Sequence, residues 1–168
     1  LSQIIRDFTM MYHYGESPLA NFRQMVEKTV SLCRPLCDEG GIALELDISP
    51  NLEQFGPFKR LGLVLYHLIK NAIESIQRAG HEEGLIELKV KETPGYLHLE
   101  CLDSGPGVSE AMREVLLEPY TSTKEQSYGQ GLGLFVVYKI VQSDWGGTLR
   151  YLGSEEGAKF EVKIPLER

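Results

Sequence analysis

Apolar and polar residues follow two different periods along the chain, and these periods predict helices and strands in a mixed order. Apolar side chains recur three and four positions apart over residues 1–12, 18–39, 58–79 and 132–146, which predicts four amphipathic helices. Ser17 and Pro18 indicate the start of the second helix, because proline is favoured at the first helical position. A strand-like period of two occurs in five segments, at residues 42–49, 85–92, 96–103, 147–153 and 158–166.

The helix predicted over residues 58–79 has two distinct faces. Its expected buried stripe consists of Leu61, Leu65, Leu68, Ala72 and Ile76. At 100° per residue, four polar residues share the opposite side: His67, Asn71, Glu74 and Arg78. This grouping makes the polar side a candidate for chemistry, whereas the simpler interpretation is a solvated helical face.

The stretch DSGPGV, residues 103–108, places a carboxylate where an apolar strand ends. Gly105 and Gly107 then turn the chain. Two interpretations stay open at this point: the glycines only form a turn and Asp103 only caps it, or the turn presents Asp103 to a ligand.

A long polar loop precedes the stretch GQGLGL, residues 129–134, which opens the last helix. The stretch lacks the Lys-Ser or Lys-Thr ending of a Walker loop, and it does not leave a strand directly as the dinucleotide fingerprint does. Its glycines would let backbone amides approach an anion at a helix N-terminus, and the alternative interpretation is a flexible hinge.

Composition narrows the class of protein. A net charge of −7 and a pI near 5.2 argue against a nucleic-acid surface, which needs clustered Lys and Arg. The three cysteines are odd in number and form no CxxC pair, so the sequence indicates neither a disulfide framework nor a zinc site, and a cytoplasmic setting is expected. Cys33 and Cys37, one helical turn apart, are predicted to be core or half-buried helix residues without a redox role. The chain opens at Leu1 in a helical pattern, which suggests a piece of a longer protein.

Four motifs in order resemble the catalytic ATP-binding domain of two-component sensor histidine kinases. YHLIKNAIES resembles the N box, DSGPGV the first glycine box, EPYTSTK the entry to the lid, and GQGLGLFVVYKIVQSDWGGTL the second glycine box with its helix. The short lid and the NAIES form look most like nitrogen-regulation-type kinases. The resemblance implies a two-layer α/β sandwich, the Bergerat fold, in which three helices cover one face of a mixed five-stranded sheet.

The resemblance also assigns roles to the nucleotide site. Asn71 would be the ligand of a Mg²⁺ ion that bridges the phosphates of ATP. Asp103 would accept a hydrogen bond from the exocyclic amine of adenine, and Gly105 and Gly107 would let the chain pass close to the ring. Residues 119–130 would form a lid, and the remaining candidates for contacting or shaping the phosphate site are Thr123, Lys124, Gly129, Gly131, Leu132 and Gly133.

His67 and Lys124 are the candidate catalytic residues. Hydrolytic ATPases of the same superfamily resemble one another in a glutamate four residues before the metal-binding asparagine, where it activates water. This chain has His67 at that position, which is similar to members that act as kinases.

The resemblance implies transfer of the γ-phosphoryl group of ATP to a histidine outside this chain, because no histidine here has the phosphoacceptor context. Residues 1–17 would be the end of a dimerisation helix and residues 18–168 the catalytic domain. The expected partners are the upstream dimerisation domain, a response regulator receiver domain and a second copy in a homodimer, and a membrane anchor in the full-length protein is left open. Three alternatives are a nucleotide-sensing module that transfers no phosphate, a hydrolytic ATPase and an anti-sigma-factor serine kinase.

Overall fold

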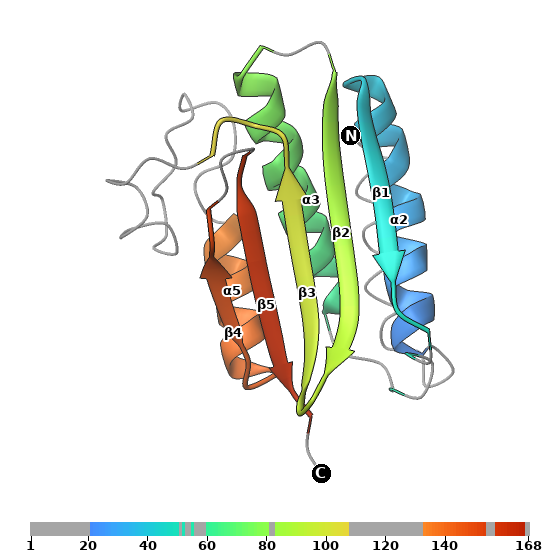
Figure 1. Ribbon diagram of the computed structural model, residues 1–168, viewed down its shortest axis with the longest axis vertical. Helices are drawn as coiled ribbons and strands as arrows, with labels where there is room; N and C mark the ends of the chain where they lie inside the picture. The colour runs from blue at the N-terminus through green and yellow to red at the C-terminus, as the bar shows by residue number, and fades with distance from the viewer. Residues whose placement is uncertain are drawn as a thin grey trace.

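The computed structural model describes residues 21–50, 52, 55, 60–80, 83–107, 133–153 and 157–166. The described part contains three helices and five strands (Figure 1). In chain order they are α2 (Phe22–Glu39), β1 (Ile42–Ile48), α3 (Leu61–Arg78), β2 (Gly84–Thr93), β3 (Tyr96–Asp103), α5 (Gly133–Ser143), β4 (Thr148–Tyr151) and β5 (Lys159–Pro165). All five predicted strands are present.

The strands form a single sheet in the order β1-β2-β3-β5-β4. β1 and β2 are parallel, and the other neighbouring pairs are antiparallel. The three helices lie together behind one face of this sheet, which leaves the other face without a covering layer in the described part (Figure 1). The prediction of a two-layer α/β fold with a mixed five-stranded sheet is therefore confirmed.

The core lies between the sheet and the helices. Alternate residues of each strand point into it, as the period of two requires. The stripe predicted on α3 is buried along its whole length, with exposed fractions between 0% and 2% for Leu61, Leu65, Leu68, Ala72 and Ile76. Cys33 and Cys37 are buried free thiols, as predicted, and burial raises the pKa of Cys33 to about 12 and that of Cys37 to about 11.

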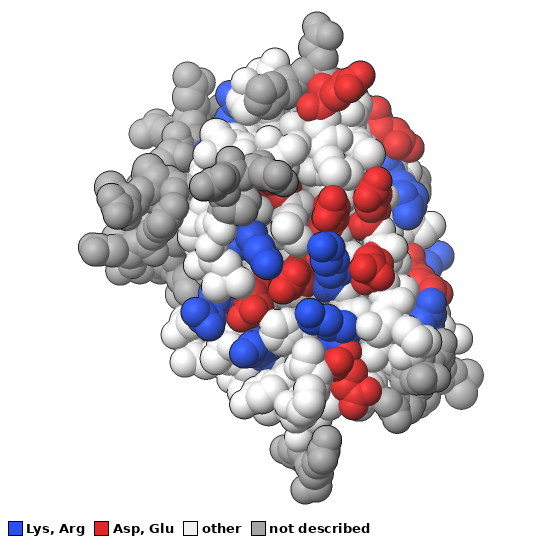
Figure 2. Space-filling model, in the orientation of Figure 1, with Lys and Arg blue, Asp and Glu red and all other residues white. Residues whose placement is uncertain are grey.

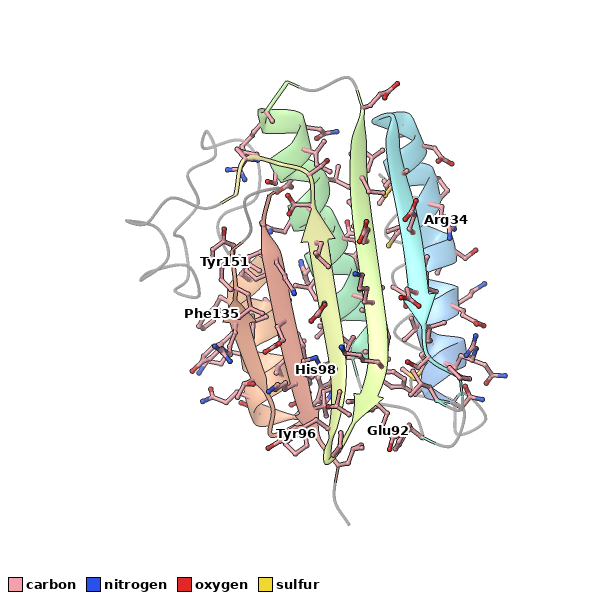
Figure 3. The ribbon with its side chains drawn as sticks, viewed as in Figure 1. Arg34, Glu92, Tyr96, His98, Phe135 and Tyr151 are labelled. Carbon is pink, nitrogen blue, oxygen red and sulfur yellow. The ribbon has the colours of Figure 1, made fainter. Side chains whose placement is uncertain are left out.

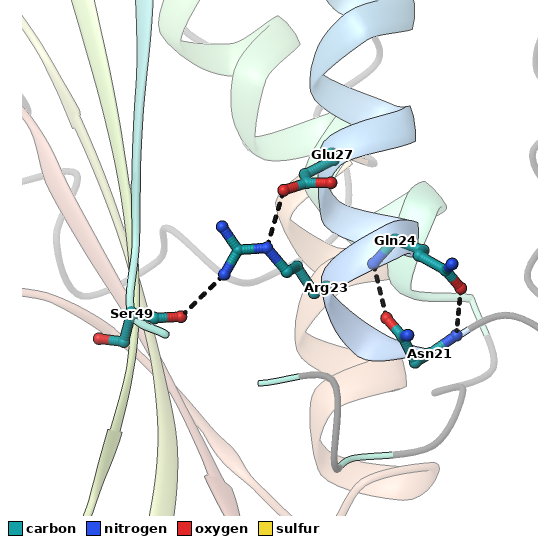
Figure 4. Close-up of polar contacts among 5 residues, drawn as sticks. All are labelled: Asn21, Arg23, Gln24, Glu27 and Ser49. Carbon is teal, nitrogen blue, oxygen red and sulfur yellow. Dashed lines mark hydrogen bonds and ion pairs between the residues drawn. The ribbon is translucent and has the colours of Figure 1, made fainter. Parts of the chain in front are cut away.

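The start of α2 differs from the prediction. Asn21 is the N-cap residue, so the helix begins at Phe22 and not near Pro18. The Asn21 side chain accepts a hydrogen bond from the backbone N–H of Gln24, and the Gln24 side chain accepts one from the backbone N–H of Asn21, which is a complete capping box (Figure 4). The physical reason for the difference is that this reciprocal pair satisfies two free N–H groups, whereas a proline satisfies none. The proposed boundary between residues 17 and 18 lies outside the described residues.

Arg23 ties the first turn of α2 to the end of β1 (Figure 4). Its guanidinium donates to the Glu27 carboxylate at 2.9 Å and to the backbone oxygen of Ser49 at 3.2 Å. The bond to Ser49 joins the helix to the edge strand of the sheet, and the bond to Glu27, one turn along α2, orients the Arg23 side chain.

The hairpin between β2 and β3 places Asp103 at the end of β3. Pro94 and Gly95 make the turn, and Gly95 has a φ of +84°, which a glycine adopts without strain. The register pairs Thr93 with Tyr96 and Ile86 with Asp103. Asp103 therefore lies at the C-terminal end of β3, the central strand of the sheet, next to the start of β5 (Figure 1).

Candidate functional site

The candidate site is built around Asp103, the last residue of β3. Its side chain points to the helix side of the sheet and the residue is 6% exposed. Its backbone N–H donates to the Ala158 oxygen at 3.0 Å, and its carboxylate oxygen Oδ1 accepts from the Gly105 N–H at 2.8 Å. The strand end, the glycine turn and the start of β5 thus hold one carboxylate in a defined position.

Ser75 is a site residue that the sequence analysis missed. It lies on α3, is 3% exposed, and its hydroxyl donates a hydrogen bond to the Asp103 carboxylate. Its signal in the sequence is a small polar residue in the buried stripe, between Ala72 and Ile76. The motif assigned to this part of α3 directed attention to Asn71, one turn earlier.

The chemistry of Asp103 reflects a balance between burial and donors. Burial raises the pKa of its carboxyl above the ordinary value, because an ionised group loses water contacts there. Hydrogen bonds from the backbone of Gly105 and Ala158 and from the hydroxyl of Ser75, together with the charge of Arg78, act in the opposite direction. The donors stabilise the ionised form, which is the form that accepts hydrogen bonds from a ligand.

Two glycines beside Asp103 cannot carry a side chain without moving their neighbours. A Cβ on Gly105 would overlap the Ser75 hydroxyl and lie 2.8 Å from Asp103 Oδ1. Gly157, at the start of the β5 segment, has a φ of +150°, and a Cβ there would overlap the Asp103 backbone oxygen. The sequence analysis named Gly105 as a candidate site residue from the motif that contains it. It did not name Gly157, because the approach of Gly157 to Asp103 joins residues far apart in the chain.

Gly107 has a φ of +76°, so the second glycine of the motif is required by the backbone. A Cβ there would lie 3.4 Å from both the Gly157 oxygen and the Tyr151 hydroxyl. The Tyr151 ring, labelled in Figure 3, packs edge-on against Phe160 at 5.4 Å between centroids, which supports the position of the Tyr151 hydroxyl beside the turn.

His67 and Gly133 lie next to each other, as their shared assignment to the nucleotide site requires. Gly133 is the first residue of α5, and a Cβ on it would lie 3.3 Å from His67 Nδ1. Burial, and then the charge of Lys70, lower the pKa of His67 to about 4. The imidazole is therefore neutral at pH 7, and one of its nitrogens is an acceptor.

Asn71 is half-buried and lies one turn after His67 on α3. An amide oxygen is a hard ligand of the kind that Mg²⁺ binds, and Mg²⁺ takes few protein ligands because it keeps waters and phosphate oxygens. The donor set on this face of α3 is thus compatible with a Mg²⁺–nucleotide complex. The other predicted lid and phosphate residues lie outside the described residues: Thr123, Lys124, Gly129, Gly131 and Leu132.

Comparison with known proteins agrees with this geometry. Residues 56–168 match the family HATPase_c, described as histidine kinase-, DNA gyrase B- and HSP90-like ATPases. The chain belongs to this family, and within it to the histidine kinase type of ATP-binding catalytic domain, because its relatives are sensor kinases. ATP is the nucleotide of this family, typically with Mg²⁺.

The relatives include the C4-dicarboxylate transport sensor protein DctB of Rhizobium meliloti, which is 34% identical over 95% of this chain and 25% of its own length. The sensor histidine kinase ZraS of Escherichia coli O157:H7 is 35% identical over 64% of this chain and 22% of its own. Among solved structures, the catalytic domain of histidine kinase ThkA has a TM-score of 0.73 at 24% identity, covering 87% of this chain and 93% of that one.

The chain thus spans about a quarter of the length of curated relatives of this kind. These relatives are of several sensor types, so the family is shown and the nitrogen-regulation subtype stays a prediction. In the part of the chain that the structure describes, no helix has the length and apolar content needed to cross a membrane.

Proposed function

We propose that this domain binds ATP with Mg²⁺ and delivers the γ-phosphoryl group to a histidine on an upstream dimerisation domain of the same protein. The group would then pass to an aspartate of a response regulator. The observation that carries this proposal is the buried Asp103 carboxylate, held at the end of β3 by Ser75 and Gly105 in a chain of the histidine kinase-like ATPase family.

Asp103 selects the base. Its carboxylate accepts a hydrogen bond from the exocyclic amine of adenine, and guanine has no amine at that position. A carboxylate has about four acceptor positions, and donors from Gly105, Ala158 and Ser75 use three of them, so one acceptor position would be left for the adenine amine. A site built on a buried polar group discriminates strongly, since the wrong base leaves that group unpaired.

Asn71 and His67 act at the phosphates. Asn71 would hold Mg²⁺, which when bound neutralises phosphate charge and aligns the γ-phosphoryl group. The neutral His67 imidazole, one turn before Asn71 on α3, would accept or donate one hydrogen bond at the phosphate end of the site. A histidine there is a weaker activator of water than the glutamate of hydrolytic relatives, so this arrangement favours transfer to a protein side chain over hydrolysis.

The rest of the phosphate site would come from the segment before α5. We assign phosphate contacts to Lys124 and Thr123, and the shaping of the lid hinge to Gly129, Gly131, Leu132 and Gly133. The catalytic unit would be residues 18–168, following a dimerisation helix that ends near residue 17, in a homodimeric nitrogen-regulation-type kinase.

Calorimetric titration with ATP and GTP, each with and without Mg²⁺, tests the nucleotide assignment. We expect ATP to bind, Mg²⁺ to strengthen binding, and GTP to bind at least tenfold more weakly. Asp103→Asn should weaken ATP binding about tenfold or more, because the amide presents an N–H to the adenine amine. Asp47→Asn, an exposed Asp on β1, is the matched control and should bind ATP like the wild type.

Equal affinity of Asp103→Asn and wild type for ATP would remove Asp103 from the base site. Transfer itself is tested by adding a separately made dimerisation hairpin with γ-labelled ATP and following label on its histidine. Nucleotide binding without any labelled histidine, while inorganic phosphate is released, would favour the hydrolytic alternative. Binding with neither outcome would favour a nucleotide-sensing module.

A further inference from the structure

Three metal-ligating side chains meet on the face of the sheet that the helices leave open. His98 and Glu100 lie on β3, and Glu161 lies on β5. The antiparallel register places Glu100 directly opposite Glu161, and His98 lies two residues before Glu100, on the same face of β3. His98 is labelled in Figure 3. One imidazole nitrogen of His98 and one oxygen from each carboxylate lie within 4.8 Å of one another.

Two members of this cluster are buried although they lie on the open face. His98 is 8% exposed and Glu161 is 7% exposed. His98 Nδ1 and Glu161 Oε1 have no hydrogen-bond partner among the described residues, and the contact between His98 Nε2 and Glu161 Oε2 is 3.7 Å long. A buried polar atom without a partner costs roughly 1–3 kcal/mol, so two neighbouring residues that each carry such an atom call for an explanation, and a bound ligand at the cluster is one.

The basic side chains near the cluster do not form close ion pairs with its two carboxylates. Figure 2 shows Lys and Arg interspersed with Asp and Glu on this face. Lys159 is 3.5 Å from Glu100, and Arg150, whose side chain is 61% exposed, is 3.9 Å from Glu161. Both distances exceed the 2.7–2.9 Å or so of a charge-assisted hydrogen bond, so neither pair has the geometry of a strong ion pair. The two carboxylates meanwhile face each other across the strands, which is unfavourable for like charges.

We propose that His98, Glu100 and Glu161 form a binding site for a divalent transition-metal ion, with Zn²⁺ as the ion of matching chemistry. One imidazole and two carboxylates are ligands that Zn²⁺ accepts in a tetrahedral site, with water in the fourth position. Ligand atoms around Zn²⁺ lie roughly 3.3 Å apart for bonds of about 2.0–2.1 Å. Binding would require the two glutamate side chains to rotate so that their oxygens come closer than the present spacing of up to 4.8 Å.

The ion would join β3 to β5 and offset the repulsion between Glu100 and Glu161. It is distinct from the Mg²⁺ that the nucleotide brings. Asp103 faces the helices from the same strand on which His98 and Glu100 face the open side, and Asn71 lies on α3. The proposed Zn²⁺ site therefore does not depend on the proposed kinase function, and its test needs no nucleotide.

Titration of the 168-residue chain with Zn²⁺ by calorimetry, in the absence of ATP and Mg²⁺, tests the site. We expect one ion per chain for this site and a higher Tm in its presence. His98→Gln and Glu100→Gln should each weaken Zn²⁺ binding at least tenfold, since even the loss of an outer partner of a metal ligand costs about 10- to 100-fold. Glu45→Gln, which changes an exposed glutamate on the same face in β1, should bind Zn²⁺ like the wild type.

Co²⁺ provides a second measurement that separates this site from the cysteines. A site of imidazole and carboxylates gives only weak visible bands, whereas thiolate ligands add strong charge-transfer absorption. Zn²⁺ binding that survives in both His98→Gln and Glu100→Gln, strong thiolate bands with Co²⁺, or no Zn²⁺ binding at all would each overturn the proposal. Glu100 is itself largely buried, with 15% of its side chain exposed, but Glu100→Gln keeps the size of the side chain and is the second variant if His98→Gln fails to fold.

Discussion

The two faces of the sheet bury acidic groups in opposite ways. On the helix side, Asp103 receives hydrogen bonds from Gly105, from the Ala158 backbone and from Ser75. On the open side, Glu161 is buried to a similar degree, but its contacts with charged neighbours are 3.7 Å and 3.9 Å long. The Asp103 and Glu161 carboxylates are therefore buried to similar degrees, but the hydrogen-bonding capacity of Asp103 is used more fully than that of Glu161.

This difference in hydrogen bonding suits the two carboxylates to different ligands. Donors that hold Asp103 in place before a ligand arrives lower the cost of ordering it, as expected for a group that recognises one shape. A carboxylate without donors, beside an imidazole and a second carboxylate, is instead completed by an ion. The predictions below test how firmly the Asp103 side is built, from the largest expected effect to the smallest.

Gly157→Ala should have the largest effect on stability, a loss of about 3–5 kcal/mol. The new Cβ would overlap the Asp103 backbone oxygen at a φ of +150°, so overpacking and backbone strain add. Urea unfolding measures the loss. Gly80→Ala is the control, because Gly80 also has a positive φ, +71°, but no atom lies within 4 Å of a Cβ there, and about 1 kcal/mol is expected. Equal losses in the two variants would show that the approach to Asp103 is unimportant.

His67 should make stability depend on pH by up to about 3 kcal/mol. Its pKa is lowered to about 4 in the folded chain, against an ordinary value of 6.5, chiefly because it is buried and then because of Lys70. The unfolded chain binds the proton more readily, so this contribution is fully present above pH 6.5 and is lost as the pH falls towards 4. Unfolding free energies measured across that range should rise less steeply in His67→Gln, and an identical slope in both proteins would contradict the lowered pKa.

Local patterns were sufficient to predict most of the fold. The period of two located all five strands, and the spacing of Leu61, Leu65 and Leu68 identified the buried side of α3, because these signals arise within one element. The start of α2 was misplaced, since Pro18 is a weaker determinant than the reciprocal hydrogen bonds of Asn21 and Gln24.

Contacts between residues on different strands could not be predicted from such local patterns. Asp103 and Gly105 were identified from a motif that is contiguous in the chain. Gly157, and the meeting of His98 with Glu161, depend on the pairing of β3 with β5, whose register cannot be derived from the alternation of either strand alone. The period of two located the strands that carry His98 and Glu161, but it gave no reason to expect burial of these two residues.

Ser75→Ala should have the smallest effect of the three and is the most specific test of how Asp103 is prepared. Loss of the hydroxyl removes one donor to a buried carboxylate, so the pKa of Asp103 should rise further and ATP should bind roughly 3- to 10-fold more weakly. Ser31→Ala, an exposed serine on α2, is the matched control, because both changes replace Ser by Ala within a helix and share the same gain in helix propensity. A carboxyl NMR titration of Asp103, combined with ATP calorimetry, measures both effects. If Ser75→Ala lowers stability while leaving the Asp103 titration and the ATP affinity unchanged, Ser75 only packs against Gly105. A shift of both would show that the donor from α3 positions the carboxylate that reads the base.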